Sequence, residues 1–430
     1  MFRQNMMPMN MNMNMNMNMN MNMNMGMMNN NININQAQNI NNANQLQRPI
    51  INNIQISNIN NTTLINASLQ ALSCLKYINI WINMWNNNKM ILFNNQNLKT
   101  TKELFIVYSA LYTKQFPDSS NFILNFTNKV KSYYKGAIDN PINFLYYLLK
   151  IIHVENNYPQ NPNQNMDILN NLQIQQKVND QYVKDLFMNL LSKTQKSIIS
   201  TYFYTILRRQ FKCTVCPNAQ ITYAYEYKYM LKFYINDYYK YRNQSRPEKI
   251  QSKLSLDECF DCFTGGYKYQ CKQCGNNSAD CYYSIHSFSK ILIIGLIRSN
   301  HTYLNDLDFP NNLDINPYCT SGIYPGMKYT LKACVSLNNE KNYYADVLLG
   351  NYWYRFYQNQ CNMLGNVGVE IKMFEPQILM YELSEYNNNN NISNSQLNQM
   401  QQVNPCFGGN NMMNMKFNMM MPGAVFQGFK

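Results

Sequence analysis

Two pairs of cysteines in the middle of the chain have the spacing of metal ligands. Cys213 and Cys216 form one C-x-x-C pair, and Cys271 and Cys274 form a second, followed directly by Gly275. Two residues between cysteines let both thiolates reach one tetrahedral ion from a tight turn, which a glycine can help to form. Two such pairs leave no coordination position open for water. The spacing therefore predicts a closed, structural zinc site on these four thiols.

The charge and cysteine content narrow the function classes. The chain has 430 residues, a formal net charge of +13 and twelve cysteines. Its Lys and Arg residues are scattered, so we favour a solvated surface over a basic surface that binds nucleic acid or an acidic protein face. No pattern typical of a signal peptide stands near the N-terminus. Twelve cysteines in an unsecreted chain indicate reduced thiols and metal ligation, and we expect a cytoplasmic and/or nuclear protein.

Low-complexity sequence occupies both ends of the chain. Residues 1–48 alternate Met and Asn before becoming rich in Asn, Gln and Ile, and residues 386–430 are rich in Asn, Gln and Met. Neither segment has an amphipathic period, which predicts disorder. Residues 49–385 remain as one large domain. Its longest apolar run, Ile291–Ile297, is too short to cross a bilayer and fits a buried strand, so we expect no membrane partner.

The hydrophobic patterns predict helices first and strands later. Helical spacing covers residues 61–78, 101–115, 141–153 and 179–195, and a short amphipathic helix is expected at 254–263. Alternating or continuous apolar residues predict strands at 223–234, in the stretch ending at 297, and at 328–335, 343–349, 352–356 and 377–381. Segregation of helices and strands along the chain indicates an α+β fold.

Several segments resemble the sequence boxes of the ubiquitin-specific proteases, the papain-like thiol enzymes that cut ubiquitin from proteins. Residues 58–72 are similar to that family's nucleophile box, N-x-G-N-T-C-[FY]-M-N-[SA]-x-L-Q-x-L. Further segments are similar, in the same order, to the second box, the helix before the zinc ribbon, a central strand and the histidine box of the family: residues 180–191, 256–263, 288–299 and 329–358.

This resemblance implies a papain-like cysteine peptidase fold of the ubiquitin-specific protease type. We then expect a helical thumb over residues 49–204, fingers over 205–285 and a palm over 286–385. The family's zinc ribbon falls on the four cysteines named above. Cys259 and Cys262, although spaced C-x-x-C, fall in the helix before the ribbon and are expected to be buried helix residues instead of ligands.

The catalytic positions of the family hold other residues in this chain. Thr63 stands at the nucleophilic cysteine, Asn342 at the histidine and Tyr357 at the residue that orients the histidine, while Asn58 matches the oxyanion-stabilising asparagine. A threonine hydroxyl holds its proton far more tightly than a thiol, and an amide is no general base near pH 7. We expect Thr63 to act as a helix N-cap.

Other positions of the boxes also differ from the residues that the family's chemistry uses. Asn60 and Lys341 replace two glycines of the family near the catalytic channel. The chain has three histidines, His153, His286 and His301, and none falls in the family's histidine box.

These substitutions predict a catalytically inactive relative, a pseudo-deubiquitinase. It would bind ubiquitin or a ubiquitin-like protein, or act as a scaffolding subunit of a protein complex. One alternative is an active thiol hydrolase of ubiquitin whose nucleophile is displaced to Cys74 or Cys334. Another is a nucleic-acid-binding or RNA-processing-complex scaffold that uses the basic surface, with an affinity that falls steeply as salt is raised.

Overall fold

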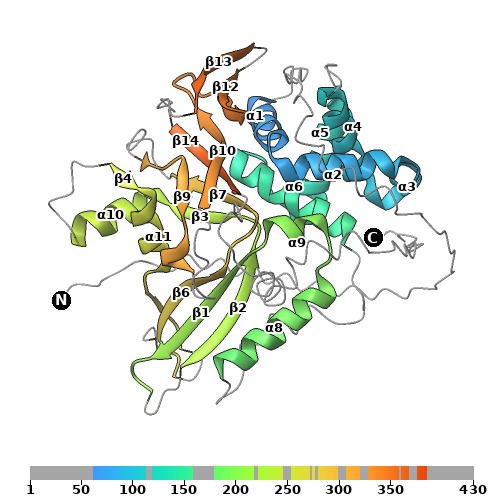
Figure 1. The fold of residues 1–430 in the computed structure, drawn as a ribbon. Coiled ribbons are helices and arrows are strands. Elements are labelled where there is room, and N and C mark those ends of the chain that lie inside the picture. Colours follow the sequence, from blue (N-terminus) through green and yellow to red (C-terminus); the bar gives the residue numbers. More distant parts are fainter. Residues whose placement is uncertain are drawn as a thin grey trace, which may run out of the picture. The chain divides into compact units, whose positions relative to one another are not determined.

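Helices make up the N-terminal half of the described chain (Figure 1). The computed structural model describes residues 62–112, 119–157, 179–216, 221–245, 253–271, 274–276, 279–298, 307–319, 328–357, 360–367 and 375–384. All of these stretches belong to one unit, residues 48–393. The predicted disordered segments, Asn58, Asn60 and His301 lie outside the described residues. None of the helices in the described stretches is long and apolar enough to cross a membrane.

The helical part is built around α6, whose apolar residues are buried on several sides. Pro141 stands at its first position, and Asn140 caps it by accepting a hydrogen bond from the Asn143 N–H at 2.8 Å. Phe144 and Leu148 are fully buried. The helices are α1 Thr62–Ser73, α2 Lys76–Asn87, α3 Lys89–Asn94, α4 Lys99–Tyr112, α5 Ser120–Tyr134, α6 Pro141–Asn156, α8 Asp180–Thr194 and α9 Ile198–Phe203, with a 3-10 turn at Gln96–Leu98.

The helix predicted over residues 61–78 is two helices, so that prediction was wrong. α1 ends at Ser73 and α2 begins at Lys76, and Leu75 between them is extended, with φ −74° and ψ 131°. Leu75 is fully buried. Its packing in the core sets the break, because tertiary contacts override a weak local helix preference. Cys74 therefore lies in the junction and not inside a helix.

Two sheets follow in the C-terminal half. The four-stranded sheet has the order β2-β1-β6-β5 and consists of β1 Thr205–Cys213, β2 Thr222–Lys228, β5 Tyr267–Tyr269 and β6 Ala279–Ser287. The larger sheet has the order β13-β12-β11-β10-β14-β7-β3, and β9 also pairs with β10. Its strands are β3 Leu231–Tyr234, β7 Ile291–Ile297, β9 Asn312–Asp314, β10 Lys328–Leu337, β11 Tyr343–Leu349, β12 Tyr352–Tyr357, β13 Gln360–Asn366 and β14 Glu375–Leu383.

Short elements complete the fold. α10 Ile235–Ser245 and α11 Leu256–Thr264 follow β3, the two-residue strands β4 Leu254–Ser255 and β8 Leu307–Asp308 pair in parallel, and a 3-10 turn covers Asn316–Tyr318. Ser255 and Glu258 form a capping box that starts α11. Cys259 in this helix is fully buried, as the sequence predicts, whereas Cys262 is only half-buried. The arrangement confirms the α+β class.

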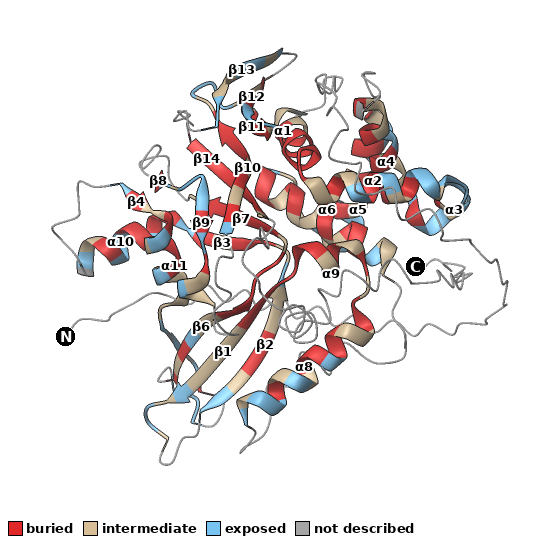
Figure 2. Cartoon of the chain, in the orientation of Figure 1, coloured by how far each residue is buried: buried red, intermediate tan, exposed pale blue. Residues whose placement is uncertain are grey.

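The core of the larger sheet lies along its central strands. Figure 2 shows buried residues along β7, β10 and β14. β7 pairs with β14 on one side and with β3 on the other, which confirms the predicted buried strand. Gly295 in β7 allows close packing here, since a Cβ at this position would lie 2.9 Å from the Met230 Sδ. A larger residue would therefore require the side chains of Met230 and Ile142 to shift.

A buried histidine joins α6 to α9 and to the start of β1. The His153 Nε2 lies 2.6 Å from the Gln195 Oε1, and its Nδ1 lies 2.6 Å from the Ser197 Oγ. Because an amide oxygen only accepts, these partners assign the proton of the neutral ring to Nε2. The Tyr204 hydroxyl lies 3.2 Å from the same nitrogen. Burial lowers the pKa of His153 to about 4 from its ordinary value of 6.5.

We expect His153 to make the fold sensitive to acid. Its pKa is lower in the folded state, so the unfolded chain binds more protons as the pH falls, and stability is lost between about pH 6.5 and pH 4. The loss should be of order 3 kcal/mol over that window. Urea unfolding across this range measures it, and His153→Gln, which cannot titrate, should remove this part of the slope. Identical slopes for the two proteins would contradict the assignment.

Candidate functional site

The three residues at the degenerate catalytic positions lie at one place in the fold. Thr63 is in the first turn of α1, Asn342 directly precedes β11, and Tyr357 ends β12. The Tyr343 N–H donates a hydrogen bond to the Thr63 Oγ1 at 3.4 Å, and the Asn342 Nδ2 donates to the Tyr357 hydroxyl at 3.4 Å. The antiparallel pairing of β11 with β12 and the packing of α1 on β11 bring these groups together.

An acidic residue that the sequence boxes do not single out completes this group. The Tyr357 hydroxyl donates to the Glu340 Oε2 at 2.9 Å. The hydroxyl thus lies between the amide of Asn342 and the carboxylate of Glu340. The Glu340 carboxylate accepts from the phenol, and the phenol in turn accepts from the Asn342 amide. This chain of contacts contains no histidine, so it can hold the turn but supplies no general base for Thr63.

The turn between β10 and β11 keeps a backbone shape suited to glycine. Lys341 has φ 60°, in the left-handed region that costs a residue with a side chain roughly 1 kcal/mol. The Asn338 side chain holds this shape, because its Oδ1 accepts the N–H groups of Glu340 at 3.0 Å and Asn342 at 2.8 Å. The Lys341 N–H also donates to the Asn338 carbonyl at 3.0 Å. Lys341 itself is exposed beside the degenerate catalytic positions.

A buried ion pair fixes the strands that carry these residues. Asp346 on β11 is fully buried and lies opposite Arg355 on β12. The Arg355 Nε and Nη2 donate to the two carboxylate oxygens at 2.7 and 2.8 Å. The guanidinium also lies over the Tyr344 ring, 4.3 Å from its centroid. Burial raises the pKa of Asp346, and Arg355 opposes that shift.

The predicted N-cap role of Thr63 was wrong. The helix begins at Thr62, so Thr63 lies within the first turn instead of before it. Its hydroxyl oxygen accepts from the Tyr343 N–H of the neighbouring strand, which attaches α1 to β11.

The two described histidines lie away from Thr63. His153 is enclosed by Gln195, Ser197 and Tyr204 in the helical part. His286 lies in β6 with its ring 5.4 Å from that of Tyr225, and burial lowers its pKa to about 4. Neither donates to or accepts from the degenerate positions.

The two thiols proposed as displaced nucleophiles are buried. Cys74 is 2% exposed, and its Sγ lies 3.0 Å from the Ala71 carbonyl oxygen. Cys334 is fully buried in β10, 3.3 Å from the Ser336 Oγ, and burial raises its pKa to about 12. A reactive cysteine needs an accessible thiol, and neither of these two thiols is accessible.

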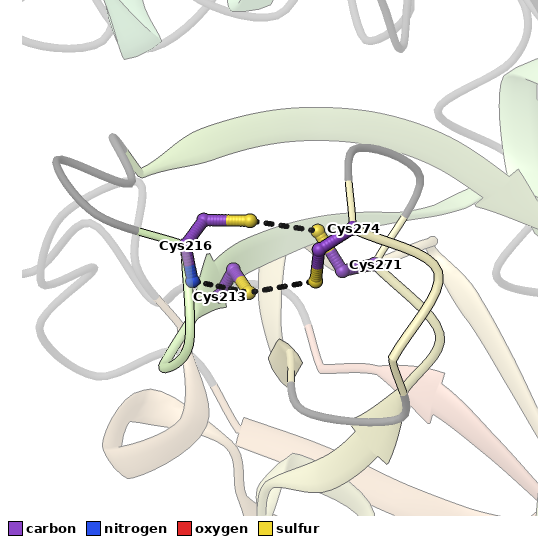
Figure 3. A group of neighbouring side chains, drawn as sticks. All are labelled: Cys213, Cys216, Cys271 and Cys274. Atoms are coloured by element: carbon purple, nitrogen blue, oxygen red, sulfur yellow. Dashed lines mark hydrogen bonds between the residues drawn. The ribbon is translucent and has the colours of Figure 1, made fainter.

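Four cysteines from two hairpins meet at the end of the smaller sheet (Figure 3). The sulfurs of Cys213, Cys216, Cys271 and Cys274 all lie within 4.8 Å of one another. The distances from Cys213 to Cys274 and from Cys216 to Cys271 are 3.8 and 3.7 Å. Four sulfurs around a zinc ion at about 2.3 Å would be about 3.8 Å apart, so this cluster can hold a structural metal ion as predicted.

Backbone geometry supports the second knuckle. Gly275 has φ 72° and donates its N–H to the Cys271 carbonyl at 2.8 Å. The first pair closes similarly, with the Cys216 N–H directed at the Cys213 Sγ at 3.3 Å. The Cys216 N–H can stabilise the Cys213 thiolate, whereas the Gly275 N–H closes the turn of the second pair on a carbonyl.

The helix that resembles the second family box lies against the smaller sheet. Asp180 at the start of α8 binds Arg208, with the Nε to Oδ2 distance at 2.9 Å, and accepts from the Tyr225 hydroxyl at 2.9 Å. Gln181 donates to Asp185 one turn later on the exposed side of α8. Tyr182, at the position of the family's aspartate, is 61% exposed.

Comparison with known proteins agrees with this architecture. The sequence model described as ubiquitin carboxyl-terminal hydrolase matches residues 54–381. No curated protein matches the chain. A structure of the yeast SAGA DUBm carrying a mutant Sgf73 contains a chain with a TM-score of 0.54 and 20% identity, with 79% of this chain and 70% of that chain covered.

Two further structures contain ubiquitin or a ubiquitin derivative. The SAGA DUB module Ubp8/Sgf11/Sus1/Sgf73 bound to monoubiquitin gives a TM-score of 0.54 at 19% identity, with 79% and 70% of the two chains covered. The same module bound to ubiquitin aldehyde gives 0.53 at 19% identity, with 79% and 71% covered. At such identities the likeness establishes the fold.

Removing the partner of Asp346 should destabilise the protein strongly. Arg355→Met leaves a buried carboxylate without its cation, which typically costs about 3–5 kcal/mol. Chemical denaturation measures this loss. The double variant Asp346→Leu with Arg355→Met should recover much of it, because neither charge is then buried alone. A single variant as stable as the double variant would contradict the role of the pair.

The four-thiol cluster should bind one zinc ion per chain in a way that supports folding. Cys271→Ser should lower the zinc content measured by elemental analysis, and strong chelation should lower the thermal midpoint of the wild type. Cys262→Ser is the matched control, since Cys262 shares the C-x-x-C spacing but lies in α11. Full zinc content in Cys271→Ser, or an equal loss in Cys262→Ser, would contradict the site.

Proposed function

The chain belongs to the ubiquitin carboxyl-terminal hydrolase family, and from this premise we propose that it acts in the ubiquitin system without hydrolysing peptide or isopeptide bonds. Its role is that of a pseudo-deubiquitinase, a ubiquitin-binding or scaffolding subunit. The observation that carries this proposal is the convergence of Thr63, Asn342 and Tyr357 where the family's chemistry requires a thiol, an imidazole and its orienting residue.

The proton-transfer chemistry supports the absence of hydrolysis. A nucleophile must lose its proton to a nearby base as it attacks. The hydroxyl of Thr63 accepts from a backbone N–H, and Asn342 presents an amide nitrogen that donates to Tyr357. Asparagine cannot take up the proton, and the buried thiols of Cys74 and Cys334 offer no replacement nucleophile.

The structural neighbours support a role within a protein assembly. Their chains come from a module that contains Sgf11, Sus1 and Sgf73, with monoubiquitin or ubiquitin aldehyde bound in two of the structures. By analogy with these modules, this chain would bind ubiquitin or companion subunits, and neither kind of binding requires a working triad. A nucleic-acid partner rests on the net charge alone and is the weaker candidate. A role in the cytoplasm, the nucleus or both is consistent with this proposal.

We expect purified protein to give no turnover of a fluorogenic ubiquitin substrate and no labelling by ubiquitin with a C-terminal electrophile. The variant that combines Thr63→Cys, Asn342→His and Tyr357→Asn restores the family's residue types and should gain labelling by the electrophile. Wild-type turnover that is abolished by Cys74→Ala or by Cys334→Ala would contradict the proposal and identify the displaced nucleophile.

Ubiquitin binding needs its own measurement. Titration of the chain into isotopically labelled ubiquitin should shift or broaden a contiguous set of ubiquitin amide signals. Lys341→Gly is the informative variant, because it restores the glycine of the family at an exposed position and suits the observed φ of 60°. Unmoved ubiquitin signals with both proteins would exclude ubiquitin binding and leave only the scaffolding role.

A further inference from the structure

Two lysines lie around one tyrosine on the face of α6. The Lys150 Nζ is 4.6 Å from the centroid of the Tyr134 ring and 5.8 Å from that of Tyr146. The Lys232 Nζ on β3 is 4.9 Å from the centroid of the same Tyr146 ring. Both lysines are half-buried. Cation–π contacts of this kind stabilise an ammonium group only in part, because they leave its N–H donors without acceptors.

Neither lysine has an anionic partner among the residues that the structure describes. Glu155, on the same helix as Lys150, instead binds Lys129 at 2.6 Å and accepts two backbone N–H groups. Glu226, on the strand before Lys232, lies 3.2 Å from Lys228. The carboxylates of this region are therefore engaged elsewhere. Burial lowers the pKa of both Lys150 and Lys232, which means that the protein holds these charges at a cost.

The tyrosines behind Tyr146 supply no compensating charge. Tyr229 has its ring 6.3 Å from that of Tyr146, and Tyr204 and Tyr227 stack at 4.2 Å. Burial raises the pKa of each of these three phenols, so they stay neutral near pH 7. The group continues to His153, which is neutral as well. The phenols behind Tyr146 therefore bring no negative charge to this place, and the N–H donors of the two lysines have no protein acceptor among the described residues.

We propose that Lys150 and Lys232, held around the ring of Tyr146, form a binding site for the oxyanion groups of an acidic peptide segment. A carboxylate or phosphate would accept charge-assisted hydrogen bonds from the free N–H donors. The attraction is stronger here than on an open surface, because the lysines are partly removed from water. No residue assigned to the degenerate triad or to the four-thiol cluster takes part.

The position of the site indicates how one partner could reach it. Lys150 is nine residues after Pro141 on α6, or about 14 Å along the axis. α6 packs against α1, the helix that carries Thr63. About four or five extended residues span that distance. A peptide segment that runs along α6 from its Pro141 end would reach Lys150 within that length.

The test measures the reactivity of each lysine in the full-length protein. Acetylation by a mild amine reagent, followed by peptide mass spectrometry, gives a rate for each site at fixed pH and ionic strength. The probes are a Glu-rich peptide, the same peptide with Gln in place of Glu, and inorganic phosphate. Exposed Lys89 on α3 is the reference site. We expect the Glu-rich peptide to slow Lys150 and Lys232 by about tenfold at roughly ten times its Kd, with Lys89 unchanged.

Each other outcome has a defined meaning. Protection by phosphate with none by the peptide would overturn the peptide ligand, and equal slowing of Lys89 would overturn a specific site. No protection by any probe would overturn the proposal altogether. Lys150→Gln and Lys232→Gln should each weaken binding of the Glu-rich peptide by about tenfold, typical of a lost charge-assisted contact, while Lys89→Gln leaves it unchanged. The wild-type reactivity measurement decides the question even if one variant fails to fold.

Discussion

The ion pair between Asp346 and Arg355 is the interaction on which the geometry of the site depends. A fully buried carboxylate is tolerated only when its charge is matched and its oxygens are hydrogen-bonded, and Arg355 provides both. The pair sets β11 against β12 in a single register. That register puts Asn342 and Tyr357 side by side at the ends of their strands, with α1 packed alongside. The strands thus position the side chains whether or not those side chains can react.

Folding and chemistry are consequently carried by different residues. The fold relies on the buried pair, on the packing of β7 among its neighbours and on four cysteines that join two hairpins. Thr63, Asn342 and Tyr357 lie at the edge of this structure and are all half-buried. Replacing a thiol or an imidazole at such positions removes reactivity without opening a cavity in the core. A hydrolase fold can therefore keep its architecture when the residues at three such sites change.

The sequence predicted those parts of the molecule that have a short-range signal. Cysteine spacing located the metal cluster, and a continuous apolar run located β7. The division between α1 and α2 was missed because its cause, the burial of Leu75, is a tertiary contact. The role of Glu340 was missed for a similar reason. It contacts Tyr357 only because a turn and a strand end meet, and the boxes assign no function to its position.

For the α2 helix and the Asp346–Arg355 pair, the sequence contains a pattern that is compatible with the observed structure but does not establish it. Ile78, Trp81, Ile82 and Trp85 follow helical spacing and are buried, although asparagines interrupt the pattern. Asp346 and Arg355 are nine residues apart on strands joined by a tight turn, which makes a cross-strand pair possible but does not show that it is buried. Depth in the core is decided by the whole fold and could not be read from two charged positions.

The turn at Lys341 has a left-handed conformation that usually requires glycine, although the residue there is a lysine. The carboxamide of Asn338 accepts two main-chain hydrogens and so templates the bend from a neighbouring position. Glycine would adopt this φ of 60° freely, whereas Lys341 is held in it by the hydrogen bonds of Asn338. The turn therefore keeps the backbone shape that suits glycine, while a positively charged side chain is exposed next to Asn342. A partner that approaches Asn342 from solvent therefore meets the positive charge of Lys341 beside it.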